Sequence, residues 1–275
     1  MRLKLELNPD SLFLPANYNY CFSAAIYKLL KLDTPEFTSF LRKIGFTLEG
    51  RLFKFYNFAL RFSYSRIDNG IIILNSRNLK LYISFPLIDD FFCECTSKNI
   101  DTQKIEVVSN NQKYSFLISD VQCLPTPSFQ KTNKFTLLSP IVLSSGRKIS
   151  KLKPYPYYLR FDDNMEDINR VFNQNLRDKY QQLHESEFKG KDLIFKWDNQ
   201  YIESRLSSNN YIAKKITIQK ENQQSFNVIA NFIPFVVTGD SLLIKTGFEC
   251  GFGQMNSMGF GMAGLVSPQL RGVKS

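Results

Sequence analysis

Apolar and charged residues alternate at the start of the chain. Leu3, Leu5 and Leu7 share one face of this period-two pattern, which is typical of a half-buried β-strand. Apolar side chains at helical spacing then predict a helix over about residues 22–32. In the remainder of the first half we expect a short helix at 37–43, a helical stretch after Pro86, and strands at 51–64 (two runs), 70–74, 80–85, 105–108 and 114–123.

Proline interrupts the middle of the chain at Pro125-Thr126-Pro127. Because proline continues neither a helix nor the interior of a sheet, this segment is predicted to be a linker. The expected domains are residues 1–126 and residues 127–275, and the second contains a glycine-rich segment at 251–261.

The second half repeats the succession of strands and helices. Its strongest helix signal runs from Asn164 to about Glu187, and Glu166 and Asp167 lie where the helix dipole favours acidic side chains. Strands are predicted at 134–143 (interrupted at Pro140), 193–197, 213–220, 226–235 and 262–266, and a short helix at 240–249. This repetition predicts an α+β fold of two tandem ferredoxin-like (βαββαβ) domains with antiparallel sheets.

Charge points to the class of partner. Lys and Arg (35) exceed Asp and Glu (25), which gives a net charge of +10 and favours a polyanion such as nucleic acid. Three basic runs lie in the second half: Arg147, Lys148, Lys151 and Lys153; Lys189, Lys191 and Lys196; Lys214, Lys215 and Lys220. The first run precedes Tyr155, Tyr157 and Tyr158, and cations interleaved with aromatic rings suit single-stranded RNA. Each run alone is equally typical of a solvated face.

Signals for metals, membranes and export are missing from the sequence. The five cysteines are scattered and the single histidine is His184, so no metal-ligand spacing occurs and neither a metal nor another cofactor is expected. No apolar run is long enough to span a membrane, and the first residues lack the apolar core of a signal peptide. We therefore expect a cytoplasmic protein with free thiols and no membrane contact.

One segment carries an unusual density of glycine. Residues 251–261 read GFGQMNSMGFG. Glycine permits backbone conformations closed to other residues, and successive N–H groups in such a loop can hold a phosphate. The spacing fits neither a Walker loop nor a dinucleotide-binding fingerprint. Phe252 and Phe260 can stack on bases or point inward as core anchors, and a tight turn between helix and strand is the purely structural alternative.

Two Gly-hydrophobic-Gly triplets separated by five residues resemble the G-loop of the RAMP superfamily. More specifically, they resemble the family of CRISPR-associated endoribonucleases that process precursor CRISPR RNA. Further stretches resemble that family in the same order along nearly the whole chain: residues 17–20 leading into 25–27, 135–141 and 175–180.

The resemblance implies a metal-independent cleavage of RNA. In this reaction the ribose 2′-hydroxyl attacks the adjacent phosphate and leaves a 2′,3′-cyclic phosphate and a 5′-hydroxyl. The implied partners are CRISPR repeat RNA within precursor CRISPR RNA and subunits of a CRISPR interference complex, with the protein a monomer or a homodimer. The candidate RNA-binding residues are Gly251, Gly253, Gln254, Asn256, Ser257, Gly259 and Gly261, together with Arg147, Lys148 and Lys151.

The family's catalytic positions map onto the first half. Its tyrosine corresponds to Tyr27, for which a half-buried packing role is the structural alternative, and its lysine to Lys54, with Arg51 competing. Its histidine follows a leucine, but this chain has Leu41-Arg42, and arginine cannot exchange a proton near neutral pH although it can neutralise a phosphate. Three alternatives stay open: cleavage through Tyr27, Arg42 and Lys54, RNA binding without cleavage, or His184 in place of the missing histidine. A generic RNA-recognition module is a weaker fourth.

Overall fold

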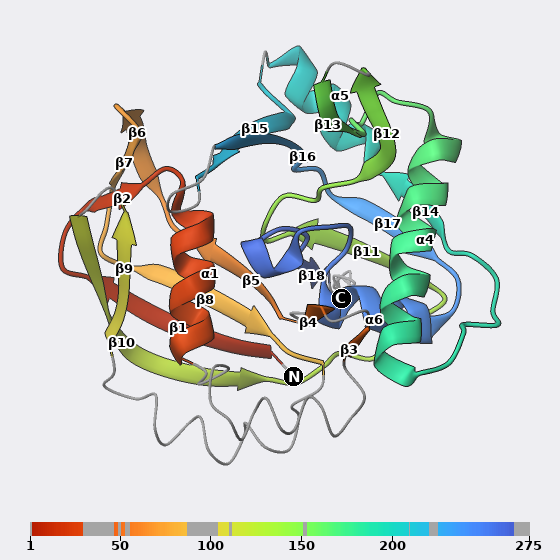
Figure 1. The fold of residues 1–275 in the computed structure, drawn as a ribbon, viewed down its shortest axis with the longest axis horizontal. Helices are drawn as coiled ribbons and strands as arrows, with labels where there is room; N and C mark the ends of the chain where they lie inside the picture. Colours follow the sequence, from red (N-terminus) through yellow and green to blue (C-terminus); the bar gives the residue numbers. More distant parts are fainter. Residues whose placement is uncertain are drawn as a thin grey trace, which may run out of the picture.

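The structure, a computed structural model, describes residues 2–29, 47–48, 51–52, 56–86, 104–109, 112–150, 153–208, 210–219 and 225–266. Each half of the chain builds one main antiparallel sheet, and the two halves lie side by side (Figure 1).

The first half builds a five-stranded sheet in the order β5-β8-β1-β10-β9, with every neighbouring pair antiparallel. Its elements are β1 (Arg2–Pro9), α1 (Tyr18–Leu29), β5 (Asn57–Arg61), β8 (Leu79–Ser84), β9 (Lys104–Ser109) and β10 (Gln112–Leu124). Leu3, Leu5 and Leu7 are buried, as their alternation predicted. Helix α1 covers this face and packs Phe22 against Phe116, with 5.1 Å between ring centroids.

Two smaller sheets belong to the same half. Strands β2 (Phe13–Pro15), β6 (Tyr64–Asp68) and β7 (Ile71–Leu74) form a three-stranded sheet in the order β2-β7-β6, and β3 (Thr47–Leu48) pairs with β4 (Arg51–Leu52). The β6–β7 turn places Asn69 and Gly70 at φ values of 47° and 76°. Asn and Gly tolerate this left-handed region and are therefore typical of such hairpins.

The second half builds a four-stranded antiparallel sheet in the order β14-β17-β11-β18. Its elements are β11 (Thr132–Leu137), α4 (Met165–His184), β14 (Ile194–Trp197), β17 (Phe235–Thr238), α6 (Ser241–Cys250) and β18 (Ala263–Leu265). Helix α4 begins where predicted, because the Asn164 side chain accepts a hydrogen bond from the Glu166 backbone N–H at 2.7 Å.

Both sheets follow one topological rule. In chain order, β1, β5, β8 and β10 of the first half correspond to β11, β14, β17 and β18 of the second. In each case the sheet order is second, third, first, fourth. This is the strand order of a ferredoxin-like βαββαβ unit, so the protein consists of two tandem ferredoxin-like domains, as predicted. No regular structure lies between β10 and β11, where the linker was expected.

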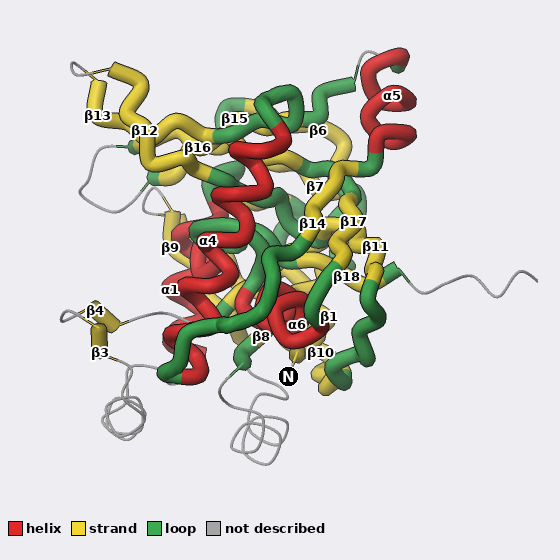
Figure 2. Tube along the Cα trace, turned by 90° about the vertical axis from the view of Figure 1, so that its right-hand side faces the viewer, coloured by secondary structure: helices red, strands yellow, loops and turns green. Residues whose placement is uncertain are grey.

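Additional elements are inserted into the second half. The hairpin β12 (Ser144–Ser150) and β13 (Lys153–Tyr158) precedes α4, whereas α5 (Asn199–Ser207) and the hairpin β15 (Ala213–Ile218) and β16 (Phe226–Asn231) separate β14 from β17. A short 3-10 helix, η1 (Asn256–Met258), lies between α6 and β18. Figure 2 shows α5 and β15 at the same end of the molecule.

The structure corrects several predicted elements. The strand expected at 226–235 is wrong: β16 and β17 belong to different sheets. The break contains Pro234, which has no N–H to donate to a β-ladder. The β12–β13 hairpin and α5 were not predicted. The expected helices at 37–43 and after Pro86 lie outside the described residues. Among the described residues, no helix combines the length and the apolar character needed to cross a membrane.

The two halves share a hydrogen-bonded seam. The buried Arg2 guanidinium of β1 donates to the carbonyl oxygens of Ala263 (2.8 Å) and Phe248 (3.0 Å) in the second half. It also lies 3.9 Å from the centroid of the Phe248 ring. Burial lowers the pKa of Arg2 to about 10, against the opposing effect of Glu249. Thr126 and Glu249 are joined by a further bond of 3.3 Å.

Candidate nucleic-acid interface

The glycine-rich segment 251–261, called the glycine loop below, lies in the seam between the halves. On one side, the Asn19 side chain of α1 donates to the Met258 carbonyl oxygen at 2.7 Å. On the other, the Gln254 N–H donates to the Val142 carbonyl oxygen at 2.8 Å. In Figure 1 the loop occupies the space between α1 and the second half. Residues from both halves therefore hold it in position.

Packing explains why glycine occupies the loop. Gly253 and Gly261 have φ values of 73° and 76°, in the left-handed region that favours glycine. A Cβ at Gly261 would overlap the Phe252 carbonyl oxygen, and one at Gly253 would overlap the Val142 carbonyl oxygen. The glycines thus bring the loop backbone against its surroundings.

The expected RNA-binding residues of the loop divide by burial. Gly251, Gly253, Asn256, Gly259 and Gly261 are buried, whereas Gln254 and Ser257 are partly exposed. Met255 and Met258 are also partly exposed. The outward side of the loop therefore consists of residues between the two glycine triplets, and the buried members shape it.

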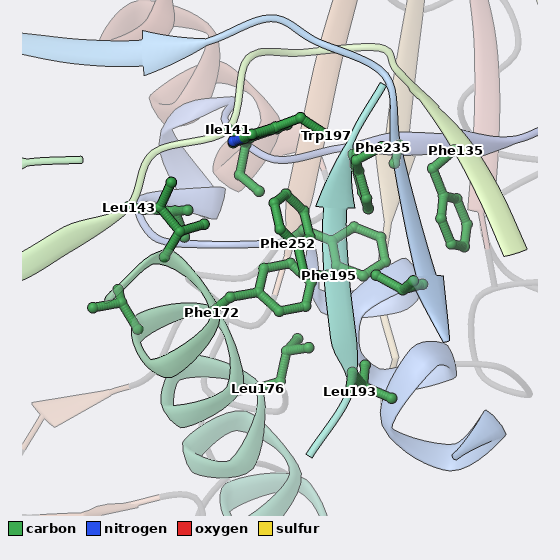
Figure 3. Close-up of a cluster of buried hydrophobic side chains, with 14 of the residues drawn as sticks. Phe135, Ile141, Leu143, Phe172, Leu176, Leu193, Phe195, Trp197, Phe235 and Phe252 are labelled. Atoms are coloured by element: carbon green, nitrogen blue, oxygen red, sulfur yellow. The ribbon is translucent and has the colours of Figure 1, made fainter. Parts of the chain in front are cut away.

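Phe252 and Phe260 both point inward and are fully buried. Phe252 stacks on Phe172 of α4, with 5.8 Å between ring centroids and an interplanar angle of 7°, and Figure 3 shows it among the aromatic residues of the second core. Phe260 joins a separate buried cluster with Val142 and Ile218. The two rings anchor the loop and, in this structure, are not available for base stacking.

A lysine of α4 holds the loop from beneath. Lys179 Nζ donates to the carbonyl oxygens of Gly251 (2.6 Å) and Gly253 (2.5 Å). Burial lowers the pKa of this ammonium to about 8, against weaker effects of Cys250 and Asp178. The sequence indicated that Lys179 lies on a long helix but not that it faces the loop, because the contact joins residues 72 positions apart.

The strand that carries part of the first basic run begins beside the loop. Arg147 and Lys148 lie on β12, whose first residue Ser144 pairs with Tyr158 of β13. The Gln254 side chain approaches the Ser144 carbonyl oxygen at 3.5 Å. Lys151 lies outside the described residues. The fold therefore joins the glycine loop to the base of the basic hairpin.

A buried asparagine ties the two inserted hairpins together. Asn231, the last residue of β16, exchanges backbone hydrogen bonds with Ile141 at 2.8 and 2.9 Å. Its side chain donates to the Leu159 carbonyl oxygen (2.9 Å) and accepts from the Phe161 N–H (3.1 Å). Since β15 carries Lys214 and Lys215, the described parts of two predicted basic runs occupy neighbouring hairpins.

The structure describes part of the expected catalytic set. Tyr27 is half-buried on α1 and packs against the core of the first half. One turn earlier on α1, the Ser23 hydroxyl lies 2.6 Å from the Tyr56 hydroxyl. Burial raises the pKa of Tyr56 to about 12. Arg42 and Lys54 lie outside the described residues. His184 ends α4, is exposed, and packs on Tyr180 with 4.3 Å between ring centroids.

Comparison with protein families identifies the chain. A family model described as "CRISPR associated protein Cas6, C-terminal" matches residues 124–265, just over half of the sequence. The chain belongs to the Cas6 family. The matched region contains the basic hairpins and the glycine loop. This confirms the family resemblance inferred from the two glycine triplets.

Individual Cas6 relatives extend the similarity to the first half. The chain is 28% identical over 269 residues to "CRISPR-associated endoribonuclease Cas6 1" of Methanocaldococcus jannaschii, covering 95% of this chain and 91% of that protein. It is 24% identical to a putative CRISPR-associated endoribonuclease-like protein Cas6nc of Pyrococcus horikoshii, covering 97% and 100%. A solved structure titled "CRISPR associated protein Cas6" matches with a TM-score of 0.68 and 26% identity, covering 97% and 99%.

Proposed function

We propose that this Cas6-family chain binds CRISPR repeat RNA and cleaves precursor CRISPR RNA as a metal-independent endoribonuclease. The observation that carries the proposal is the joining of the glycine loop to the basic β12–β13 hairpin at the seam. The similarity to an endoribonuclease along nearly the whole chain supports the same assignment.

RNA is held, in this proposal, along the outward side of the glycine loop. Gln254 and Ser257 contact the RNA directly, and Arg147, Lys148 and Lys151 neutralise its phosphates. Gly251, Gly253, Asn256, Gly259 and Gly261 act through the shape of the backbone. This division follows from burial: five of the seven loop positions are buried and two are partly exposed.

Cleavage is assigned to Tyr27, Arg42 and Lys54. The 2′-hydroxyl attacks the adjacent phosphate, and the products carry a 2′,3′-cyclic phosphate and a 5′-hydroxyl. Tyr27 supplies the proton-exchanging hydroxyl, while Arg42 and Lys54 stabilise the negative charge that develops on the phosphorane. The hydrogen bond between Ser23 and Tyr56 joins α1, which carries Tyr27, to the residue that precedes β5.

The test is cleavage of a repeat RNA in EDTA. Wild-type protein is expected to give two defined fragments, and a 2′-deoxy substitution at the cut site is expected to abolish cleavage. Tyr27→Phe should lower the rate roughly 10²- to 10⁴-fold, and Arg42→Ala and Lys54→Ala should also slow it. Tyr64→Phe, which alters an exposed tyrosine of β6, is the matched control. A requirement for Mg²⁺, or cleavage indifferent to the 2′-hydroxyl, would contradict the proposal.

Arg42 favours one alternative function, a non-catalytic repeat-RNA-binding subunit of a CRISPR interference complex. Arginine stands where the family has its proton-exchanging histidine. This alternative predicts tight, strongly salt-dependent binding of repeat RNA without turnover at any pH. Turnover that depends on Tyr27 or Lys54 would exclude it.

A further inference from the structure

Two cations, one from each half, lie over the same aromatic ring, and a third cation stands close to them. Arg61, the last residue of β5, lies 6.0 Å from the centroid of the Phe232 ring. Lys214 of β15 lies 4.9 Å from the same centroid. Arg205 of α5 lies 6.0 Å from the ring of Tyr201 on its own helix. The Phe232 ring is therefore shared by a cation of the first half and a cation of the second.

The three cations have no acidic counterpart among the residues that the structure describes. Neither Arg61, Lys214 nor Arg205 forms an ion pair there, whereas Lys134, Arg170 and Arg177 each bind an aspartate within 2.7 Å. The residue Lys214 as a whole stays exposed while its ammonium lies over the Phe232 ring. Burial of the ammonium lowers the pKa of Lys214, and Arg61 and Arg205 lower it further. Like charges are thus close enough to repel one another.

Arg205 is the third cation of the group and is only partly buried. Its Nε–H is buried and has no hydrogen-bond partner within the described part of the chain. The two terminal nitrogens of a guanidinium can donate two parallel hydrogen bonds to phosphate oxygens. Cations that lie close together without an ion-paired acid are an arrangement that an anion stabilises.

The strand β15 links this cluster to the glycine loop. Its last residue, Ile218, is buried in the same cluster as Phe260 of the loop. Lys214 lies four residues earlier on the strand, which corresponds to roughly 13 Å at 3.3 Å per residue. The cations and the contact with the glycine loop therefore lie at opposite ends of one strand.

We propose that Arg61, Lys214 and Arg205 form a second phosphate-binding subsite, which holds the backbone of the bound RNA across the seam between the two halves. The inference rests on the proposed function, because the ligand is the same RNA strand. Arg61 and Arg205 donate guanidinium hydrogen bonds to the phosphate, and Lys214 contributes a point charge. Phe232 supports two of the cations from beneath. The subsite adds affinity without taking part in the chemistry.

The experiment measures binding of a repeat RNA that carries a 2′-deoxy substitution at the cut site, so that turnover does not interfere. Arg61→Gln and Lys214→Gln are each expected to lower the affinity roughly ten-fold. Each should also reduce the slope of log K against log salt by about 0.7, the contribution of one single-strand phosphate. The double variant should lose less than the sum of the single losses, because both cations bind one phosphate. Arg170→Gln, which removes an exposed arginine already paired with Asp167, is the matched control.

Thermal melting separates this role from a structural one. Removing Arg61 relieves repulsion with Lys214, so Arg61→Gln should melt at the same temperature as wild type or higher. A lower melting temperature together with unchanged affinity would mean that the cluster holds the halves together, and would overturn the subsite. The subsite would also be overturned if wild type binds the repeat RNA and Arg61→Gln and Lys214→Gln bind it with the same affinity and salt slope. That result would leave the proposed function standing. Absence of repeat-RNA binding by wild type would instead overturn the proposed function.

Discussion

Comparing Gly261→Ala with Gly70→Ala separates two costs of adding a methyl group to the glycine loop: steric overlap with neighbouring atoms and strain in the backbone. Gly261 and Gly70 have the same φ of 76°. A Cβ at Gly70 meets nothing within 4 Å, whereas a Cβ at Gly261 would overlap the Phe252 carbonyl oxygen and lie 2.8 Å from the Asn256 side-chain nitrogen. Gly70→Ala therefore carries the backbone strain alone, and Gly261→Ala carries the strain together with the overlap.

The expected magnitudes follow from these two contributions. The left-handed conformation costs an alanine about 1–2 kcal/mol, and overpacking of a buried site costs typically about 1–3 kcal/mol. Gly70→Ala should thus lose about 1–2 kcal/mol of unfolding free energy, and Gly261→Ala about 2–5 kcal/mol. At roughly 2–4 °C per kcal/mol, the melting temperature should fall by a few degrees in the first variant and by about 10 °C in the second.

Circular dichroism melting of the two variants beside wild type measures this difference. Repeat-RNA affinity, measured well below both melting temperatures, adds a functional comparison. Gly261→Ala should bind more weakly because its loop backbone is displaced, while Gly70→Ala should bind like wild type. Equal losses of stability in the two variants would refute the reasoning, since the overlap at Gly261 would then contribute nothing.

Two further predictions concern the anchors of the loop. The folded-state pKa of Lys179 is about 8, below its ordinary value of 10.5, so between these values the unfolded chain binds more protons and the free energy of unfolding rises with pH. The stability of wild type relative to Lys179→Met, measured by urea unfolding, should therefore increase from pH 8 to pH 10.5; a decrease would contradict the burial of the ammonium. Phe252→Ala should cost about 3–5 kcal/mol because the ring is fully buried. Phe13→Ala, at a side chain 49% exposed, should change stability by only about 0.5 kcal/mol. Similar costs for the two phenylalanine variants would exclude an anchoring role for Phe252.

The sequence by itself determined the fold class and drew attention to the glycine loop. Which face of an element is buried is indicated by local patterns, such as the alternation at Leu3, Leu5 and Leu7 and the apolar stripe of α4. The order of such elements was enough to predict two ferredoxin-like units. The two glycine triplets indicated a loop of special conformation, and their spacing resembles that of the family to which the chain belongs.

Only the tertiary structure decided what each buried face meets. Lys179 contacts Gly251 across 72 residues of sequence, and Asn19 contacts Met258 across 239. Arg61 shares the Phe232 ring with Lys214 although no local pattern relates them. Periodicity could not separate β16 from β17 either, because an apolar strand has the same pattern in either sheet. The hydrophobic pattern specifies which residues are buried but not which residues they pack against. Those packing partners are set by the fold of the whole chain.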